Sequence, residues 1–294
     1  MNKILDSFST RDIALFIWIF ISVILMLFSK NIRNSMFGFL KALFIKEFIF
    51  ILFLFLIHTL FYVFALHKVN LWHMSLLKDT VFWMFGFGCV TMFNVNDLNK
   101  NSDFKKLLIE VLKWTVIIEY FVNFFTFSLT KEIIILPILV WFSMMQVYAS
   151  YKEEHKPVEK MMKFIIGCFS IFIFFFSLYK TITNSTDFFT IENLKTFILP
   201  VILSITFLPF LYIFNLVVKY DSLWSILNWN IKERRTRQNL KLKIMLIANF
   251  DIDKIVSISQ NIAKPINIYN DFSYSMVKKI IKGKYIGFDE ESYD

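Results

Sequence analysis

Residues 48–66 read FIFILFLFLIHTLFYVFAL, a stretch of 19 residues without a charged side chain. A bilayer has a hydrocarbon core about 30 Å thick, and a helix rising 1.5 Å per residue needs about 20 residues to cross it. The stretch is therefore long enough to span a membrane. Of the 294 residues in the chain 57% are hydrophobic, against roughly 45–50% in soluble domains. Because the excess lies in further stretches of this kind, the predicted fold class is an all-α, polytopic membrane helix bundle.

Seven stretches of 17 to 23 residues are apolar enough to be transmembrane helices. The fourth and fifth are separated only by Thr130, Lys131 and Glu132, and so short a connection predicts a helical hairpin. Residues 1–218 are thus predicted to form the transmembrane bundle, and residues 219–294 a small helical module in the cytoplasm. The predicted spans are 12–29, 48–66, 76–95, 107–129, 132–149, 164–180 and 197–218.

Lysine and arginine in the short loops predict the orientation of the bundle, since cytoplasmic loops contain the excess of these residues. The loops after the first, third and fifth spans contain four, three and four of them, 11 in all, against 7 on the opposite side. This count predicts a multi-pass protein of the cell inner membrane with its N-terminus outside and its C-terminus in the cytoplasm. No small-residue cleavage site follows the first span, which is therefore expected to be retained.

Polar residues recur on one face of the predicted fourth span. Thr115, Glu119, Asn123 and Thr126 are spaced i, i+4, i+8 and i+11, which places them on one side of a helix. An ionisable residue at mid-bilayer costs roughly 2.5–3.5 kcal/mol on insertion scales, so Glu119 needs a reason. Two interpretations stay open. Either the stripe lines a water-filled path, or its members bond to a neighbouring helix and Glu119 is protonated.

His58 lies near the middle of the predicted second span, between Ile57 and Thr59. A neutral histidine bonded to a neighbouring helix is one interpretation. The other pairs His58 with Glu119, because a carboxylate and an imidazole at similar depth would offset each other's burial.

Signatures of catalysis and metal binding are missing from the sequence. It contains no GxSxG, GxxxxGK or CxxC motif, and its two cysteines, Cys89 and Cys168, both lie in apolar stretches. Asp251-Ile252-Asp253 matches the DxD of metal-dependent glycosyltransferases but comes without a nucleotide-binding domain. No catalytic residue, metal site or cofactor is predicted.

The segment after the last span combines apolar and basic residues. Trp224 and Trp229 with Leu223, Ile226 and Leu227 precede a basic cluster, which is typical of a juxtamembrane helix with its charges on anionic lipid headgroups. Nucleic acid would need the same charges, but the adjacent membrane span favours lipid. The predicted headgroup-binding or partner-binding residues are Lys232, Arg234, Arg235, Arg237, Lys241 and Lys243.

Two short amphipathic helices are predicted beyond the basic cluster. Asp251 is expected to cap the first, whose apolar face is Ile255, Ile258 and Ile262 and which ends before Pro265. A second is expected from Asp271 or Ser273 to about Gly283, with Val277, Ile280 and Ile281 on one face. Such helices are too small for a catalytic domain and suit docking to a cytoplasmic signalling partner or to another copy of the chain.

Three classes of function fit these features. The first is a non-enzymatic membrane effector, of the defence or toxin type, that perturbs or permeabilises the membrane on a cytoplasmic signal. It fits the missing catalytic motifs, and the abundance of Phe, Ile, Lys and Asn is typical of AT-rich coding sequence on horizontally acquired islands. The second is a transporter or channel for a small solute or ion, lined by the stripe around Glu119. The third is a membrane-embedded enzyme that acts on lipid-linked substrates through His58 or Glu119.

Overall fold

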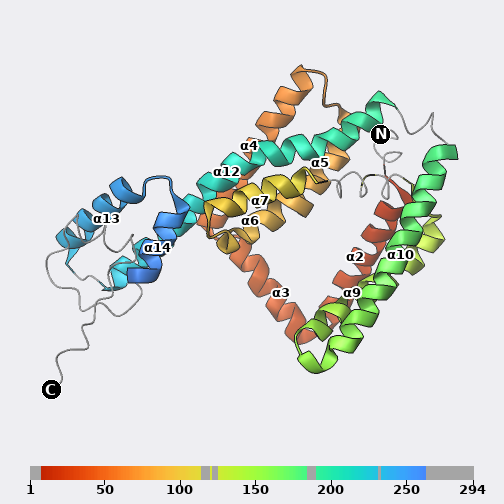
Figure 1. Ribbon diagram of the computed structural model, residues 1–294, viewed down its shortest axis with the longest axis horizontal. Coiled ribbons are helices and arrows are strands. Elements are labelled where there is room, and N and C mark those ends of the chain that lie inside the picture. Colours follow the sequence, from red (N-terminus) through yellow and green to blue (C-terminus); the bar gives the residue numbers. More distant parts are fainter. Residues whose placement is uncertain (1–7, 114–119, 121–124, 184–189, 231–232, 263–294) are drawn as a thin grey trace. The chain divides into compact units, whose positions relative to one another are not determined.

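The computed structural model describes residues 8–113, 120, 125–183, 190–230 and 233–262 (Figure 1). Every regular element in these ranges is a helix, which confirms the predicted all-α class. The longer helices are α2 (Thr10–Phe28), α3 (Lys30–Leu43), α4 (Lys46–Lys68), α7 (Asn101–Val111), α9 (Leu129–Ser150), α10 (Lys156–Thr183), α12 (Ile191–Asn230), α13 (Arg234–Ala248) and α14 (Ile252–Ile262). The shorter ones are η1 (Met74–Leu76), α5 (Leu77–Trp83), η2 (Met84–Cys89), α6 (Val90–Phe93), η3 (Val95–Asp97) and η4 (Glu153–His155).

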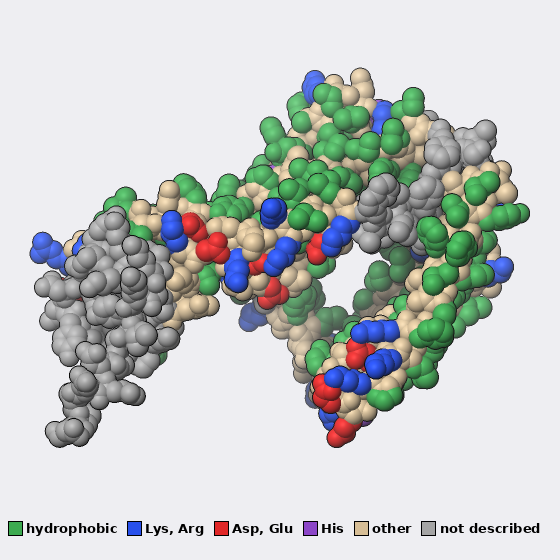
Figure 2. All heavy atoms as spheres, viewed as in Figure 1, with side chains coloured by type: hydrophobic (Ala, Val, Ile, Leu, Met, Phe, Trp, Pro, Cys, Tyr) green, Lys and Arg blue, Asp and Glu red, His purple; other side chains and the backbone are tan. Residues whose placement is uncertain are grey.

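Among the described residues, six helical segments are long and apolar enough to cross a membrane, so the fold is that of a multi-pass membrane protein. Their apolar side chains are mostly on the outside, as the space-filling view in Figure 2 shows for the face drawn there. Apolar surfaces this large mark contact with a membrane or with another protein, and the length of these helices fits a bilayer. The six segments are Thr10–Phe28, Lys46–Lys68, Met74–Phe93, Leu129–Ser150, Glu153–Thr183 and Ile191–Trp229.

These segments correspond to six of the seven predicted spans, and the predicted fourth span, 107–129, is not among them. Helix α7 ends at Val111, and residues 125–128 are not helical. Residues 114–119 and 121–124 lie outside the described residues. The polar residues Thr130, Lys131 and Glu132, predicted as a turn, instead belong to the first turn of α9, where Glu132 is buried and paired with Arg11.

The chain divides into two compact units, and the division falls inside α12. Unit 1 is Met1–Trp83 with Leu112–Leu203. In it α2 packs against α9 and α9 packs against α10, so that the three run side by side (Figure 1). The indole of Trp18 on α2 donates a hydrogen bond to the Ile133 carbonyl on α9 at 2.9 Å.

Unit 2 is Met84–Val111 with Ser204–Asp294, and it contains the longer, C-terminal part of α12. Its core is built from apolar residues at helical spacing on three helices. These fully buried residues are Phe207, Leu211, Leu223 and Leu227 on α12, Leu240, Ile244 and Ala248 on α13, and Ile252, Ile255 and Ile258 on α14.

The last membrane-length helix continues well past the predicted end of its span at residue 218. Helix α12 is one helix from Ile191 to Asn230, so the predicted boundary between residues 218 and 219 lies inside it. As a division between membrane and water that boundary stays a prediction. At 1.5 Å per residue the helix is roughly 60 Å long, about twice the thickness of a hydrocarbon core.

Candidate functional site

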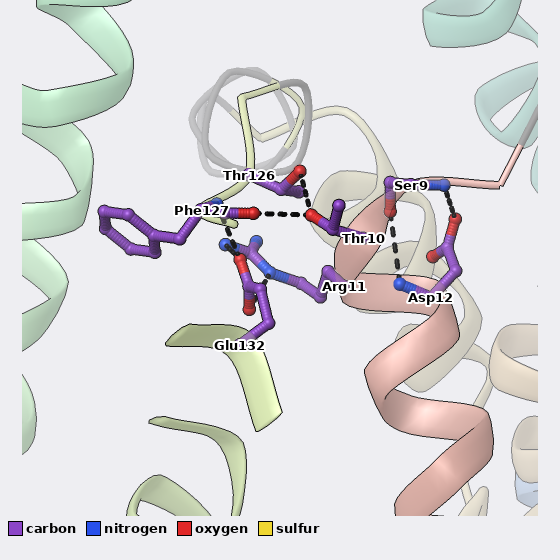
Figure 3. Close-up of polar contacts among 7 residues, drawn as sticks. All are labelled: Ser9, Thr10, Arg11, Asp12, Thr126, Phe127 and Glu132. Carbon is purple, nitrogen blue, oxygen red and sulfur yellow. Dashed lines mark hydrogen bonds and ion pairs between the residues drawn. The ribbon is translucent and has the colours of Figure 1, made fainter. Parts of the chain in front are cut away.

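The N-terminal end of α2 carries the polar site of unit 1 that Figure 3 draws. Ser9 caps the helix: its side chain accepts a hydrogen bond from the Asp12 backbone, and the Asp12 carboxylate accepts one from the Ser9 backbone at 2.9 Å. This reciprocal capping box sets where the helix begins. The next two residues, Thr10 and Arg11, then point toward the segment that leads into α9 (Figure 3).

Arg11 and Glu132 form a doubly hydrogen-bonded ion pair between α2 and α9. Arg11 Nε lies 3.2 Å from Glu132 Oε2, and Arg11 Nη2 lies 3.2 Å from Oε1. The Phe127 backbone N–H also donates to Oε1, at 3.0 Å. The Glu132 side chain is only 1% exposed, so its carboxylate is buried with three donors around it. In this planar, two-bond arrangement the arginine and the carboxylate fix each other's orientation and neutralise each other's charge.

Thr126 joins this site from the non-helical segment before α9. The Thr10 hydroxyl lies 2.7 Å from Thr126 Oγ1 and donates to the Phe127 carbonyl at 2.6 Å. We call Thr10, Arg11, Thr126, Phe127 and Glu132 the clamp. It fixes the start of α2 against the start of α9 at residues more than 110 positions apart in the chain.

The other members of the predicted polar stripe, Thr115, Glu119 and Asn123, lie outside the described residues, so the stripe stays a prediction. Its described member, Thr126, is not in a helix. His58 is on α4 and half-buried, with its ring centroid 4.8 Å from that of Tyr62 one turn later. Its predicted pairing with Glu119 also involves a residue that the structure does not describe.

In unit 2, one face of α12 binds the loop between η3 and α7. Asn215 donates from its amide to the Leu98 carbonyl at 2.8 Å. Lys219, one turn further, donates to the Asn96 carbonyl and to Asn99 Oδ1, both at 2.8 Å. Backbone carbonyls without a partner in regular secondary structure need hydrogen-bond donors from side chains such as these. The side chains of α12 therefore hold this loop in place.

The same helix binds the turn that joins α13 to α14. The Tyr220 hydroxyl donates to the Asn249 carbonyl at 2.6 Å, and the Tyr212 hydroxyl donates to the Phe250 carbonyl at 2.5 Å. Asn249, at the end of α13, has a positive φ of 50° with a ψ of −124°, and its backbone N–H donates to the Met245 carbonyl. Two tyrosines eight residues apart on α12 thus satisfy two successive carbonyls of the turn.

Asn101, the first residue of α7, completes this arrangement. Its Oδ1 lies 3.0 Å from the Tyr212 hydroxyl, and its amide nitrogen donates to Asp251 Oδ1 at 3.0 Å and to Asp253 Oδ2 at 2.9 Å. We call Asn101, Tyr212, Tyr220, Asp251 and the 249–250 carbonyls the junction. It connects α12, the start of α7 and the start of α14.

Asp251 caps α14, as the sequence predicts. Its Oδ1 accepts a hydrogen bond from the Lys254 backbone at 3.4 Å, and Ile255 and Ile258 on the predicted apolar face are fully buried. Burial alone would raise the pKa of Asp251, but hydrogen bonds from the Lys254 and Asn101 side chains lower it below its ordinary value. The predicted second helix, from Asp271 or Ser273, lies outside the described residues.

The described residues of the predicted basic cluster lie on α13, whereas Trp224 and Trp229, predicted to share a juxtamembrane helix with them, lie on α12. Arg234 and Arg235 are exposed, whereas Arg237, Lys241 and Lys243 are half-buried and Lys232 is not among the described residues. Lys241 Nζ lies 5.3 Å from the centroid of the Trp224 ring on α12. This cation–π contact joins α13 to α12. Binding of headgroups or of a partner by these residues stays a prediction.

Sequence reasoning identified neither the clamp nor the junction as a site. Glu132 and Arg11 looked like ordinary residues at helix ends, and no local signal links positions so far apart. Tyr212 and Tyr220 lie in or next to an apolar stretch, where aromatic residues are expected in any case. Within the described ranges, no three His, Cys, Asp or Glu side chains come together as metal ligands would. The absence of catalytic residues and cofactors stays a prediction.

No protein-family model, curated protein or solved structure matches this chain.

Proposed function

We propose that this protein is a non-enzymatic membrane effector of the defence or toxin type. In this proposal a cytoplasmic signal acts on α13 and α14, the junction passes it to α12, and the helix bundle then perturbs or permeabilises the inner membrane. The observation that supports it best is the pair of tyrosine hydrogen bonds, from Tyr212 and Tyr220 on a membrane-length helix to the turn between α13 and α14.

The form of α12 suits it to transmit such a signal. Both of its prolines, Pro200 and Pro209, precede Tyr212, so the part that contacts the turn contains no helix-breaking residue. Each tyrosine hydrogen bond is a neutral contact worth about 0.5–1.5 kcal/mol. A partner that binds α13 or α14 needs only a similar amount of differential binding energy to offset the loss of one of these hydrogen bonds.

The orientation that this proposal requires has the C-terminal helices in the cytoplasm. With seven spans, the N-terminus and the C-terminus lie on opposite sides of the membrane; with the six membrane-length segments alone, they lie on the same side. Reporter fusions at the two ends, one active only in the cytoplasm and one only outside, distinguish the two arrangements. A C-terminus outside the cytoplasm would contradict the proposal.

The direct test measures membrane potential with a voltage-sensitive dye during controlled expression. Under triggering or high expression the full chain should collapse the potential, and removal of residues 232–294 should change that response. Tyr212→Phe should shift the response in the same direction as the truncation, because it removes the hydrogen bond to Phe250. Tyr179→Phe, which removes an exposed hydroxyl in unit 1, is the matched control and should behave as the parent chain.

Two outcomes would favour the other classes of function. A chain that leaves potential and growth unaltered in all forms is not an effector. Substrate-dependent flux in liposomes that Glu119→Ala abolishes would instead support a transporter, and a changed lipid or glycan profile after deletion of the gene would support an enzyme. A neighbouring gene for a nuclease or a nucleotide cyclase would support the defence role.

A further inference from the structure

Helix α13 has two apolar faces, and the protein covers one of them. Leu240, Ile244 and Ala248, spaced i, i+4 and i+8, are fully buried. On the other side of the helix Leu242, Met245 and Leu246 are exposed, and Leu246 is 78% exposed. A short helix that packs against one surface needs one apolar stripe. The second stripe therefore calls for a second contact.

The exposed stripe is continued by Phe250, which is 70% exposed. We call Leu242, Met245, Leu246 and Phe250 the outer patch. Its position in unit 2 is set by the junction, because the Phe250 carbonyl accepts the hydrogen bond from Tyr212. The outer patch therefore ends beside the part of α12 that follows Tyr212.

That part of α12 is itself apolar and exposed. Ile213 and Val217, one turn apart, are each 60% exposed within a membrane-length segment. Side chains so apolar on such a helix are expected to face lipid. Lys219, Tyr220 and Asp221 follow directly, which marks where the apolar stretch gives way to polar residues. Phe250 thus lies close to the level at which α12 leaves the hydrocarbon.

Charge favours an anionic surface as the partner of this helix. Residues 234–248 contain five basic residues and no acidic residue. A helix with a cationic side and exposed large apolar side chains is typical of segments that lie in the headgroup region. The long stems of lysine and arginine let their charges reach headgroups while the apolar side chains insert.

We propose that the outer patch binds the surface of an anionic bilayer leaflet, the one that α12 enters near Tyr220. Leu242, Met245, Leu246 and Phe250 insert among the headgroups and the upper acyl chains, and the basic residues of α13 contact anionic headgroups. Of the apolar residues that the sequence suggested, Leu223 and Leu227 are fully buried in unit 2 and Trp229 is 88% exposed, so the outer patch is a further anchor, on α13. The proposal is independent of the effector function, because a transporter or an enzyme could dock its tail in the same way.

The test places a fluorescent reporter on the outer patch of the full-length protein in lipid vesicles. Cys89 and Cys168 are first replaced by serine, and Leu246→Cys is then labelled with an environment-sensitive dye. Asn239→Cys, exposed on the same face of the helix two turns earlier and outside the outer patch, is the comparison position. Quenching is measured with nitroxide-labelled lipids and with aqueous iodide, in vesicles with phosphatidylglycerol and in vesicles of phosphatidylcholine alone.

In vesicles with phosphatidylglycerol, the label at position 246 should be quenched by the nitroxide lipids and protected from iodide, and the label at position 239 should show the weaker lipid contact of the two. Protection of position 246 from iodide should fall in phosphatidylcholine. It should also fall when Arg234 and Arg235 are both changed to Gln, because the equilibrium constant for binding of the outer patch to the surface drops about fivefold for each charge that contacts it. An elution profile in detergent that matches the parent chain shows that each variant is folded.

Two results would overturn the proposal. Full access of iodide to position 246 in both kinds of vesicle would show that no surface covers the outer patch. Protection from iodide without quenching by nitroxide lipids would show that protein covers it, either a second copy or another segment of the chain. Either result leaves the membrane-potential test of the effector function unaffected.

Discussion

The clamp of unit 1 joins the starts of two helices, and the junction of unit 2 joins the starts of α7 and α14 to the interior of α12, but the two sites use different chemistry. The clamp is a buried ion pair, with Glu132 enclosed by Arg11 and the Phe127 backbone (Figure 3). At the junction, the contacts from α12 to the turn are tyrosine hydroxyls that donate to backbone carbonyls. Charge is therefore central in the first site and peripheral in the second.

The difference determines how each joint can be broken. Removal of one partner from a buried ion pair leaves an uncompensated charge and lowers the free energy of unfolding by about 3–5 kcal/mol. Such a connection is therefore not expected to open in the folded protein. A neutral hydrogen bond contributes about 0.5–1.5 kcal/mol and can be exchanged for one to water. The clamp is thus suited to a permanent connection between helices, and the junction to a connection that opens and closes.

The largest expected effect comes from the clamp. Glu132→Gln should destabilise the protein by about 3 kcal/mol, the lower end of the range for a broken buried pair, because Arg11 retains some access to solvent. The measurement is thermal unfolding of the purified protein in detergent, followed by tryptophan fluorescence. The double variant Arg11→Gln with Glu132→Gln should recover part of the loss. Strictly additive losses would show that the two residues do not interact.

A smaller effect is expected from the junction. Tyr212→Phe keeps the ring and removes one hydroxyl, so the loss of global stability should be about 1 kcal/mol. Hydrogen exchange should nevertheless rise locally, in residues 249–258, because the Phe250 carbonyl loses its donor. Tyr179→Phe is again the control. Equal exchange in the two variants would contradict the view that α12 holds the turn.

The smallest effect is the response of the junction to acid. Since the folded-state pKa of Asp251 is lowered from 3.8, its charge stabilises the fold above that pH, and the contribution is lost as pH falls through the lowered pKa. Asp251→Asn retains a helix cap but not the charge. At pH 6 the free energy of unfolding, measured by thermal unfolding, should therefore be higher for the protein than for this variant by less than about 1 kcal/mol, because the Asp251 side chain is partly exposed, and the difference should vanish once the pH falls below the lowered pKa. A difference that persists in acid would assign the effect to shape rather than charge.

Six of the seven spans and the cap of α14 could be predicted because their causes are local. A run such as 48–66 is apolar whatever surrounds it. Asp251, followed by isoleucines at helical spacing, marks the start of a helix by its local sequence alone. The prediction of a turn at residues 130–132 was wrong for a related reason. Polar residues favour a turn only on average. Here Glu132 lies in a helix, where it is buried and paired with Arg11.

Membrane location and helical class thus follow from the sequence by itself, since the free energy of transfer into lipid is a sum over neighbouring residues. Only the tertiary structure decided that Arg11 meets Glu132, that Tyr212 and Tyr220 hold the 249–250 carbonyls, and that α13 turns back along α12 with an apolar face outward. The physical reason is the short range of a hydrogen bond. It forms only when two atoms come within about 3 Å, and helix packing sets which atoms do so.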